Sequence, residues 1–98
     1  MSARKNGDEP SLKREMIILN KLGVHARPSA MFVKTASRFE CEILVEKDGE
    51  VVNGKSIMGL MMLAAGPGSK IHVQAKGSDA ATAIQELEAL IKRRFDED

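Results

Sequence analysis

The sequence predicts an α+β fold in which three helices cover one face of a four-stranded sheet. The chain has 98 residues, which suits a single small domain with one core. Stretches in which apolar and polar residues alternate are separated by stretches whose apolar residues recur at helical spacing. Their order is strand, helix, strand, strand, helix, strand, helix, without an internal repeat. Half-buried strands with helices on one side are typical of the α+β class.

The first predicted element is a buried strand. The domain is expected to span residues 14–98, after a flexible tail over residues 1–13 that mixes charges with glycine and proline. The apolar run at 16–19 predicts the strand, and a turn at 20–23 ends it. The domain therefore begins with a strand that leads directly into the next helix.

A helix and a hairpin are expected next. Apolar residues at helical spacing predict a helix over residues 26–38, and Pro28 is tolerated in its first turn because no intrahelical partner awaits its missing N–H. Alternating residues at 41–46 lead to an Asp-Gly turn at 48–49, and a return strand begins at residue 51. This pattern is typical of two neighbouring antiparallel strands.

The second helix and the fourth strand have clear boundaries. Ser56 is a suitable N-cap for a helix over residues 57–65, which a Gly-Pro-Gly segment at 66–68 ends. Residues 70–76 alternate again and predict the fourth strand, before Gly77 interrupts the pattern. Both elements should be short.

The last helix is predicted by a single apolar stripe. It begins at Ser78 or Asp79 and ends near Phe95, after basic residues that suit the negative end of the helix dipole. Its buried face should consist of Ala80, Ala83, Ile84, Leu87, Leu90 and Ile91.

Composition excludes several classes of protein. The only aromatic residues are three Phe, and the net charge is +1, which argues against base-stacking nucleic-acid modules and against binding to anionic lipid. No apolar run approaches the roughly 18 residues that span a membrane, and the first ten residues lack a signal-peptide pattern. A single cysteine, Cys41, and the absence of metal-ligand spacing favour a cytoplasmic protein without metal or cofactor. We expect protein or small-anion partners, no nucleic acid and no membrane insertion.

His25 and Arg27 form the most informative pair of residues. Both lie at the predicted start of the helix over residues 26–38, where free N–H groups and the helix dipole attract anions. Arg27 can donate two hydrogen bonds to phosphate oxygens. Such positive surroundings should favour the neutral imidazole, the form that attacks a phosphoryl group. These residues therefore indicate a phosphate site at which His25 itself could be phosphorylated.

Structural interpretations remain open for each of these positions. His25 could be only a polar N-cap, and Arg27 only a solvated charge of the first turn. Ser56 could serve only as a helix cap. The other histidine, His72, is expected to face solvent on the fourth strand, and most apolar residues of the short second helix could belong to the core.

Two separate motifs resemble one known family. The run Leu-Gly-Val-His-Ala-Arg-Pro-Ser-Ala at 22–30 is similar to the active-site signature of HPr, the histidine-containing phosphocarrier of the bacterial phosphoenolpyruvate-dependent phosphotransferase system. The run Gly-Lys-Ser-Ile-Met-Gly-Leu-Met-Met-Leu at 54–63 resembles the regulatory serine segment of the same family. The resemblance extends over residues 14–95 and implies an open-faced β-sandwich of four antiparallel strands covered by three helices.

The resemblance implies a role for each residue of the first motif. His25 would accept a phosphoryl group on Nδ1 from enzyme I and pass it to an enzyme IIA-type acceptor. Arg27 and the N–H groups of Ala26 and Arg27 would neutralise the phosphate during transfer. The protein would then be a covalent carrier and not an enzyme.

The second motif implies regulation and a docking surface. Ser56 would be phosphorylated by an HPr kinase/phosphorylase, which adds roughly −1.5 to −2 charges beside an interface. Ile57, Met58 and Met61 would contact the partners, since flexible thioethers suit a surface that accepts several proteins in turn. The alternative from another class is a regulatory binding module that is controlled by phosphorylation of Ser56 and engages a kinase or a transcription regulator, with His25 unused. A small RNA-binding domain is a weaker alternative, because the strands lack aromatic residues.

Overall fold

The sheet of the computed structural model has the strand order β1-β4-β2-β3, with every neighbouring pair antiparallel. The structure describes residues 10–21 and 23–97. The strands are β1 (Ser11–Ile17), β2 (Glu42–Lys47), β3 (Glu50–Asn53) and β4 (Lys70–Lys76). Strands β1 and β3 form the two edges, and the hairpin of β2 and β3 turns at two residues with positive φ, Asp48 and Gly49. The four-stranded antiparallel sheet and the Asp-Gly turn are thus confirmed.

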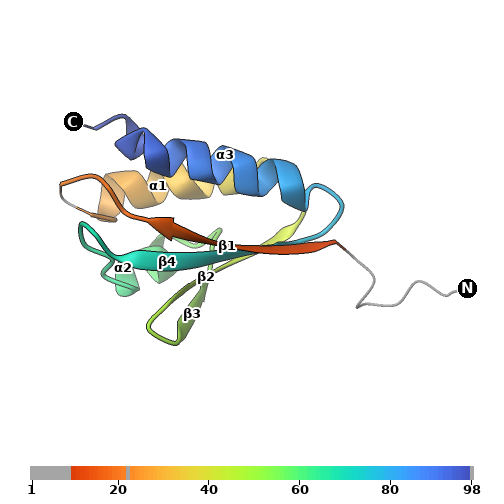
Figure 1. Cartoon of the computed structure of the whole chain (residues 1–98), viewed down its shortest axis with the longest axis horizontal. Helices are drawn as coiled ribbons and strands as arrows, with labels where there is room; N and C mark the ends of the chain where they lie inside the picture. Colours follow the sequence, from red (N-terminus) through yellow and green to blue (C-terminus); the bar gives the residue numbers. More distant parts are fainter. Residues whose placement is uncertain (1–9, 22, 98) are drawn as a thin grey trace, which may run out of the picture.

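Helices cover one face of this sheet and leave the other open (Figure 1). The helices are α1 (Ala26–Ala36), α2 (Ile57–Met62), α3 (Ala80–Lys92) and a short 3-10 helix, η2 (Arg94–Asp96). Helices α1 and α3 lie side by side, and α2 contacts α1 and β3. The predicted α+β class and the open-faced arrangement are confirmed.

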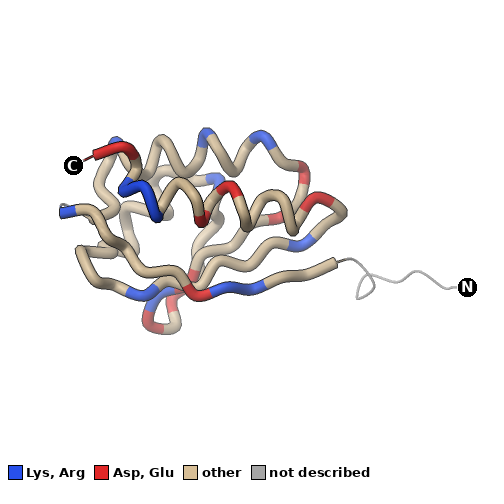
Figure 2. The backbone as a smooth tube through the Cα atoms, turned by 45° about the horizontal axis from the view of Figure 1, so that its top comes forward, with Lys and Arg blue, Asp and Glu red and all other residues tan. Residues whose placement is uncertain are grey.

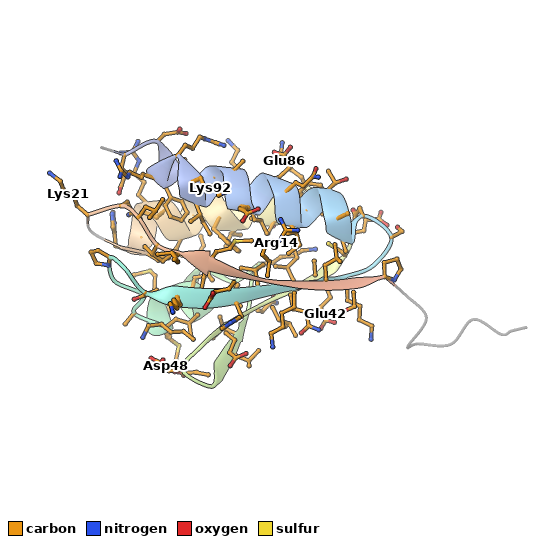
Figure 3. All side chains as sticks on the ribbon, in the orientation of Figure 1. Arg14, Lys21, Glu42, Asp48, Glu86 and Lys92 are labelled. Atoms are coloured by element: carbon orange, nitrogen blue, oxygen red, sulfur yellow. The ribbon has the colours of Figure 1, made fainter. Side chains whose placement is uncertain are left out.

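The alternation of residue types along the strands separates the two faces of the sheet. On β4, Ile71, Val73 and Ala75 are buried against the helices, while the residues between them point to the open face. Figure 3 shows the same division, with Arg14 on the helix side of the sheet and Glu42 on the open side. The whole stripe predicted for α3 is buried, so this helix closes the core. Figure 2 shows acidic and basic residues interspersed along the chain.

The first strand differs from its predicted boundaries. It begins at Ser11, so residues 11–13, which we assigned to the tail, pair with β4 in regular register. Only Met16 is buried on this strand, and Ile18 and Leu19 follow it. The pairing with β4 sets the length of β1, whereas an apolar pattern indicates only its buried part. The expected flexibility of residues 1–9 lies outside the described residues.

The helices also end earlier than the sequence predicts. Helix α1 stops at Ala36 instead of residue 38, and α2 stops at Met62 instead of residue 65. Helix α3 stops at Lys92 instead of near Phe95. Ala64 has a left-handed backbone with φ 52°, which ends the helical path before the Gly-Pro-Gly segment is reached. The path to this segment matters for the site, because the carbonyl of Ala65 accepts a hydrogen bond from the N–H of Val24, 2.8 Å away.

A left-handed turn follows α3 at the C-terminal end of the chain. Arg94, Phe95 and Asp96 have φ values of 58°, 55° and 60°, and the side chain of Phe95 is completely buried. This turn follows Lys92 and brings Glu97 to His25 at the start of α1, at the end of the molecule where α3 finishes (Figure 1). No sequence pattern had predicted the turn.

Candidate functional site

His25 is the N-cap residue of α1, but its imidazole does not cap the helix. Its backbone is extended, with φ −96° and ψ −162°, and its carbonyl accepts the first helical hydrogen bond from the N–H of Ser29 at 2.9 Å. The side chain makes no capping hydrogen bond and is 38 % exposed. Only the backbone of His25 therefore serves the helix, and its ring is available for chemistry.

Glu97 holds one nitrogen of that ring. Its Oε2 lies 3.1 Å from His25 Nε2, although the two residues are 72 positions apart. An ionised carboxylate can only accept, so the hydrogen bond requires a proton on Nε2, and the neutral form of the ring then has its lone pair on Nδ1. From the sequence we expected positive surroundings for His25. The structure instead places a carboxylate against the ring. Sequence reasoning missed Glu97, because nothing local links the chain end to the first helix.

The side chain of Asn20 holds the carboxylate of Glu97 by a hydrogen bond. This side chain is completely buried, and Nδ2 donates to Glu97 Oε1 at 3.0 Å and to the Gly23 carbonyl at 2.6 Å. The sequence had identified this residue only as part of a turn. Gly23 has φ 71°, and a side chain there would collide with the backbone of residues 65–66. The loop before α1 is therefore fixed from both sides, which holds Glu97 and His25 in place.

Arg27 and Ala26 occupy the exposed first turn of α1, as predicted. Pro28 has no N–H, and the N–H of Ser29 is already bonded, so Ala26 and Arg27 carry the free amide donors of this turn. The described residues contain no carboxylate within ion-pair distance of Arg27. Lys21 projects from the loop just before this turn (Figure 3). The start of α1 therefore offers one free guanidinium and two backbone donors beside the imidazole.

Ser56 caps α2, so its predicted structural role is confirmed. Its Oγ accepts a hydrogen bond from the N–H of Gly59 at 3.0 Å, and the residue is half-buried. The neighbouring Lys55 donates from Nζ to the carbonyl of Phe39 at 2.7 Å, which ties the loop before α2 to the end of α1. Ser56 thus lies on an anchored loop, with part of its surface open to solvent.

Four large apolar side chains of α2 are exposed, and we call them the methionine patch: Ile57, Met58, Met61 and Met62. Met62 was not among the expected contact residues, yet it is as open as the others. Because α2 packs on α1, the patch and the imidazole lie on touching elements. The only apolar residues of α2 that enter the core, Leu60 and the C-cap Leu63, point the other way.

Among the residues that the structure describes, the two groups with shifted pKa values, Cys41 and Asp79, are not among the site residues described above. Burial, together with the nearby carboxylate of Asp79, raises the pKa of the Cys41 thiol to about 11. Asp79 itself accepts hydrogen bonds from the N–H groups of Glu40 and Cys41, which hold its pKa below the usual range.

His72 lies on β4, with Nε2 3.9 Å from Glu15 Oε2. Within residues 10–21 and 23–97, no group of three metal-ligating side chains is present, and no helix there is long and apolar enough to cross a membrane.

A comparison with known protein families shows to which family this chain belongs. The family model described as "PTS HPr component phosphorylation site" matches residues 12–93. The chain belongs to the HPr family. This confirms the resemblance drawn from the two motifs, and with it the function of a phosphocarrier of the phosphotransferase system.

Individual HPr proteins are similar over nearly their whole length. The phosphocarrier protein HPr of Neisseria meningitidis is 51 % identical over 86 residues, which is 88 % of this chain and 97 % of the relative. The crystal structure of HPr-C-His from Thermoanaerobacter tengcongensis has 46 % identity and a TM-score of 0.86, and the match covers 89 % of this chain and 98 % of that one. The HPr-like protein Crh of Halalkalibacterium halodurans is 46 % identical over 82 residues, covering 84 % of this chain and 98 % of the relative.

Proposed function

We propose that His25 carries the phosphoryl group on Nδ1. The observation that supports this assignment is the contact between Nε2 and Glu97 Oε2 at 3.1 Å, because the hydrogen-bonded nitrogen keeps its proton and the other one keeps its lone pair. In the first transfer, the Nδ1 lone pair attacks phosphorus, and the bond between phosphorus and the donor breaks. The electron pair of that bond returns to the donor. In the second transfer, a nucleophile of the acceptor attacks phosphorus, the bond between phosphorus and Nδ1 breaks, and its electron pair returns to Nδ1.

Arg27 and the N–H groups of Ala26 and Arg27 stabilise the phosphoryl oxygens during both transfers. They lie on the exposed first turn of α1, where the dipole also favours negative charge. A carrier must also release its cargo, and very strong binding of phosphohistidine would slow the second transfer. A partly exposed ring with one arginine suits this requirement. The protein therefore acts as a covalent intermediate and turns over no substrate of its own.

The donor is enzyme I, and the acceptor is an enzyme IIA-type protein. Both dock on the methionine patch in turn, because its exposed thioethers adapt to different surfaces and a small apolar contact permits fast exchange. Such a relay operates in the cytoplasm, which also agrees with a chain that contains one cysteine and therefore no internal disulfide.

Ser56 regulates docking when an HPr kinase/phosphorylase modifies it. A phosphate on Oγ would lie at the border of the methionine patch and would bring charge to an apolar contact. The similarity to an HPr-like Crh protein also supports a second candidate function, namely a regulatory module that works through Ser56 without histidine phosphorylation. The two candidates differ in their dependence on His25.

One experiment separates these functions. The protein is incubated with phosphoenolpyruvate, magnesium and a bacterial enzyme I, and 31P NMR then distinguishes Nδ1 from Nε2 phosphohistidine. We expect an acid-labile, alkali-stable adduct on Nδ1 that His25→Ala abolishes and the matched control His72→Ala retains. Labelling that survives in His25→Ala would refute the carrier site. A fully active enzyme I that labels no residue would favour the regulatory module.

A further inference from the structure

Among the described residues, the exposed methionines are concentrated on one short helix. Met1 lies outside the described residues, and three of the other five methionines belong to the six-residue helix α2. The exposed fractions of Met58, Met61 and Met62 are 70 %, 42 % and 66 %. By contrast, Met16 is buried in the core, and Met31 is partly buried against it. Of the five described methionines, those of the methionine patch are therefore the most accessible to a dissolved reagent that attacks thioethers.

The single thiol does not compete for such a reagent. Cys41 is buried, and its pKa of about 11 means that the reactive thiolate is scarce at neutral pH. Oxidants that ordinarily react with cysteine thiolates would find none accessible here. Within the described part of the chain, we therefore expect the thioethers on α2 to be the sulfur atoms that oxidise first.

We propose that the methionine patch is a site of reversible oxidation by hydroperoxides, and that the resulting sulfoxides weaken docking of the phosphotransfer partners. In this step a sulfur lone pair attacks one oxygen of the peroxide, an S–O bond forms and the O–O bond breaks. The methionine loses two electrons, the proton of the attacked O–H moves to the other peroxide oxygen, and this second fragment leaves as water or an alcohol. The effect on docking rests on the function proposed above, whereas the oxidation itself does not.

The arrangement of α2 confines the effect to the surface. The buried residues Leu60 and Leu63 hold the helix on the core, and the cap from Ser56 to Gly59 involves no sulfur. Met58 and Met62 are one helical turn apart and share a ridge, as do Ile57 and Met61 on the next ridge. A sulfoxide is polar, so oxidation of one ridge converts half of the apolar contact into a hydrated surface. Reduction by a methionine sulfoxide reductase restores it.

The selectivity of oxidation can be measured without any partner. The full chain is treated with hydrogen peroxide, the peroxide is removed with catalase, and peptides are analysed by mass spectrometry over time. We expect Met58 and Met62 to oxidise at least tenfold faster than Met16, with Met61 between them. Equal rates at Met16 and on α2 would overturn the proposed site, whatever the protein does in phosphotransfer.

The functional part is tested with enzyme I and phosphoenolpyruvate. We expect partial oxidation of α2 to lower kcat/KM for phosphorylation of the protein about tenfold through a higher KM, and a sulfoxide reductase to reverse the loss. Each variant is compared with its own unoxidised form. The triple variant Met58→Leu, Met61→Leu and Met62→Leu should show no further loss on oxidation, whereas the control Met31→Leu should lose activity as the parent does.

The two possible failures look different in this experiment. An oxidised parent that is phosphorylated as fast as the unoxidised one would refute the effect on docking. An unoxidised parent that an active enzyme I cannot phosphorylate would instead contradict the proposed carrier function, and the oxidation rates would still decide whether the patch is the reactive site.

Discussion

Among single residues, Glu97 has the most direct influence on the chemistry of His25. It fixes which nitrogen carries the proton, and Asn20 keeps its carboxylate in place. Glu97→Ala should therefore increase the exchange rate of the Nε2 proton in 1H–15N spectra. It should also slow phosphorylation by enzyme I roughly fivefold, since a partly exposed charged hydrogen bond contributes about 1 kcal/mol.

The control for this substitution is Glu88→Ala. Glu88 on α3 pairs with Arg14 of β1 and with Lys92, and it does not contact the ring. It should change neither the Nε2 proton nor the rate. An unaltered Nε2 signal in Glu97→Ala would show that the carboxylate does not hold the imidazole in solution.

The sequence revealed only those site residues whose signals are local. His25 and Ser56 were identified because helix starts have recognisable neighbours, and both are N-cap residues in the structure. Glu97 and Asn20 are 77 positions apart in the chain. Their contact depends on how α3 packs and where its last turn points, so neither residue's role could be read from its neighbours in the sequence.

Among the elements, the start of α3 contains a contact whose effect depends on pH. We predicted Ser78 or Asp79 as a helix cap, and Asp79 is the N-cap residue. Its carboxylate does not cap the helix and instead accepts from the N–H groups of Glu40 and Cys41. It joins the loop before β2 to the loop after β4. A helix-cap pattern in the sequence cannot distinguish these two uses of one carboxylate.

Asp79→Asn should therefore lower stability in a pH-dependent manner. The backbone N–H of Glu40, first, and the contacts with Cys41 lower the pKa of Asp79 from 3.8, so the ionised form stabilises the fold above that pH. This contribution is lost as the pH falls through the lower folded pKa. We expect the variant to have a lower Tm at pH 7 and the difference to shrink below pH 3.8. A difference independent of pH would contradict the assignment.

The cap of α2 gives the second prediction for an element. Ser56→Ala removes the acceptor for the N–H of Gly59, which should cost about 1 kcal/mol and speed local hydrogen exchange on this six-residue helix. Ser56→Asp should keep the cap and leave Tm nearly unchanged or slightly higher, yet slow phosphorylation by enzyme I because of its charge. A large loss of stability with normal transfer rates would contradict this prediction.

The predicted boundaries of helices and strands are accurate where the residues at the boundary themselves mark it in the sequence. Strand β4 matches residues 70–76 as predicted, because alternation and flanking glycines mark both of its ends in the sequence. Strand β1 does not, since four of its first five residues are charged or polar and only pairing with β4 holds them in the sheet. Helix α2 ends early because of the backbone of Ala64, a residue type that carries no stop signal.

In the whole molecule, the site depends on two distant parts of the chain that meet at one end of the sheet. The loop before α1 supplies His25 and Asn20, and the turn after α3 supplies Glu97. Phe95 fixes that turn because its ring is completely buried among core residues from the strands and helices. The core therefore stabilises not only the fold but also, through Phe95, the position of Glu97 in the site.

Phe95→Ala should accordingly affect both stability and chemistry. Loss of a fully buried ring costs about 3–5 kcal/mol, a large part of the stability of a domain of this size, and it frees the turn that positions Glu97. We expect a much lower midpoint in urea and, at temperatures where the variant is still folded, the same rapid Nε2 proton exchange as in Glu97→Ala. Arg94→Gly is the matched control: this exposed residue has φ 58°, which glycine adopts without strain, so stability should be unchanged or slightly higher. If Phe95→Ala lowers stability but the Nε2 proton remains protected, the turn holds Glu97 without help from the core.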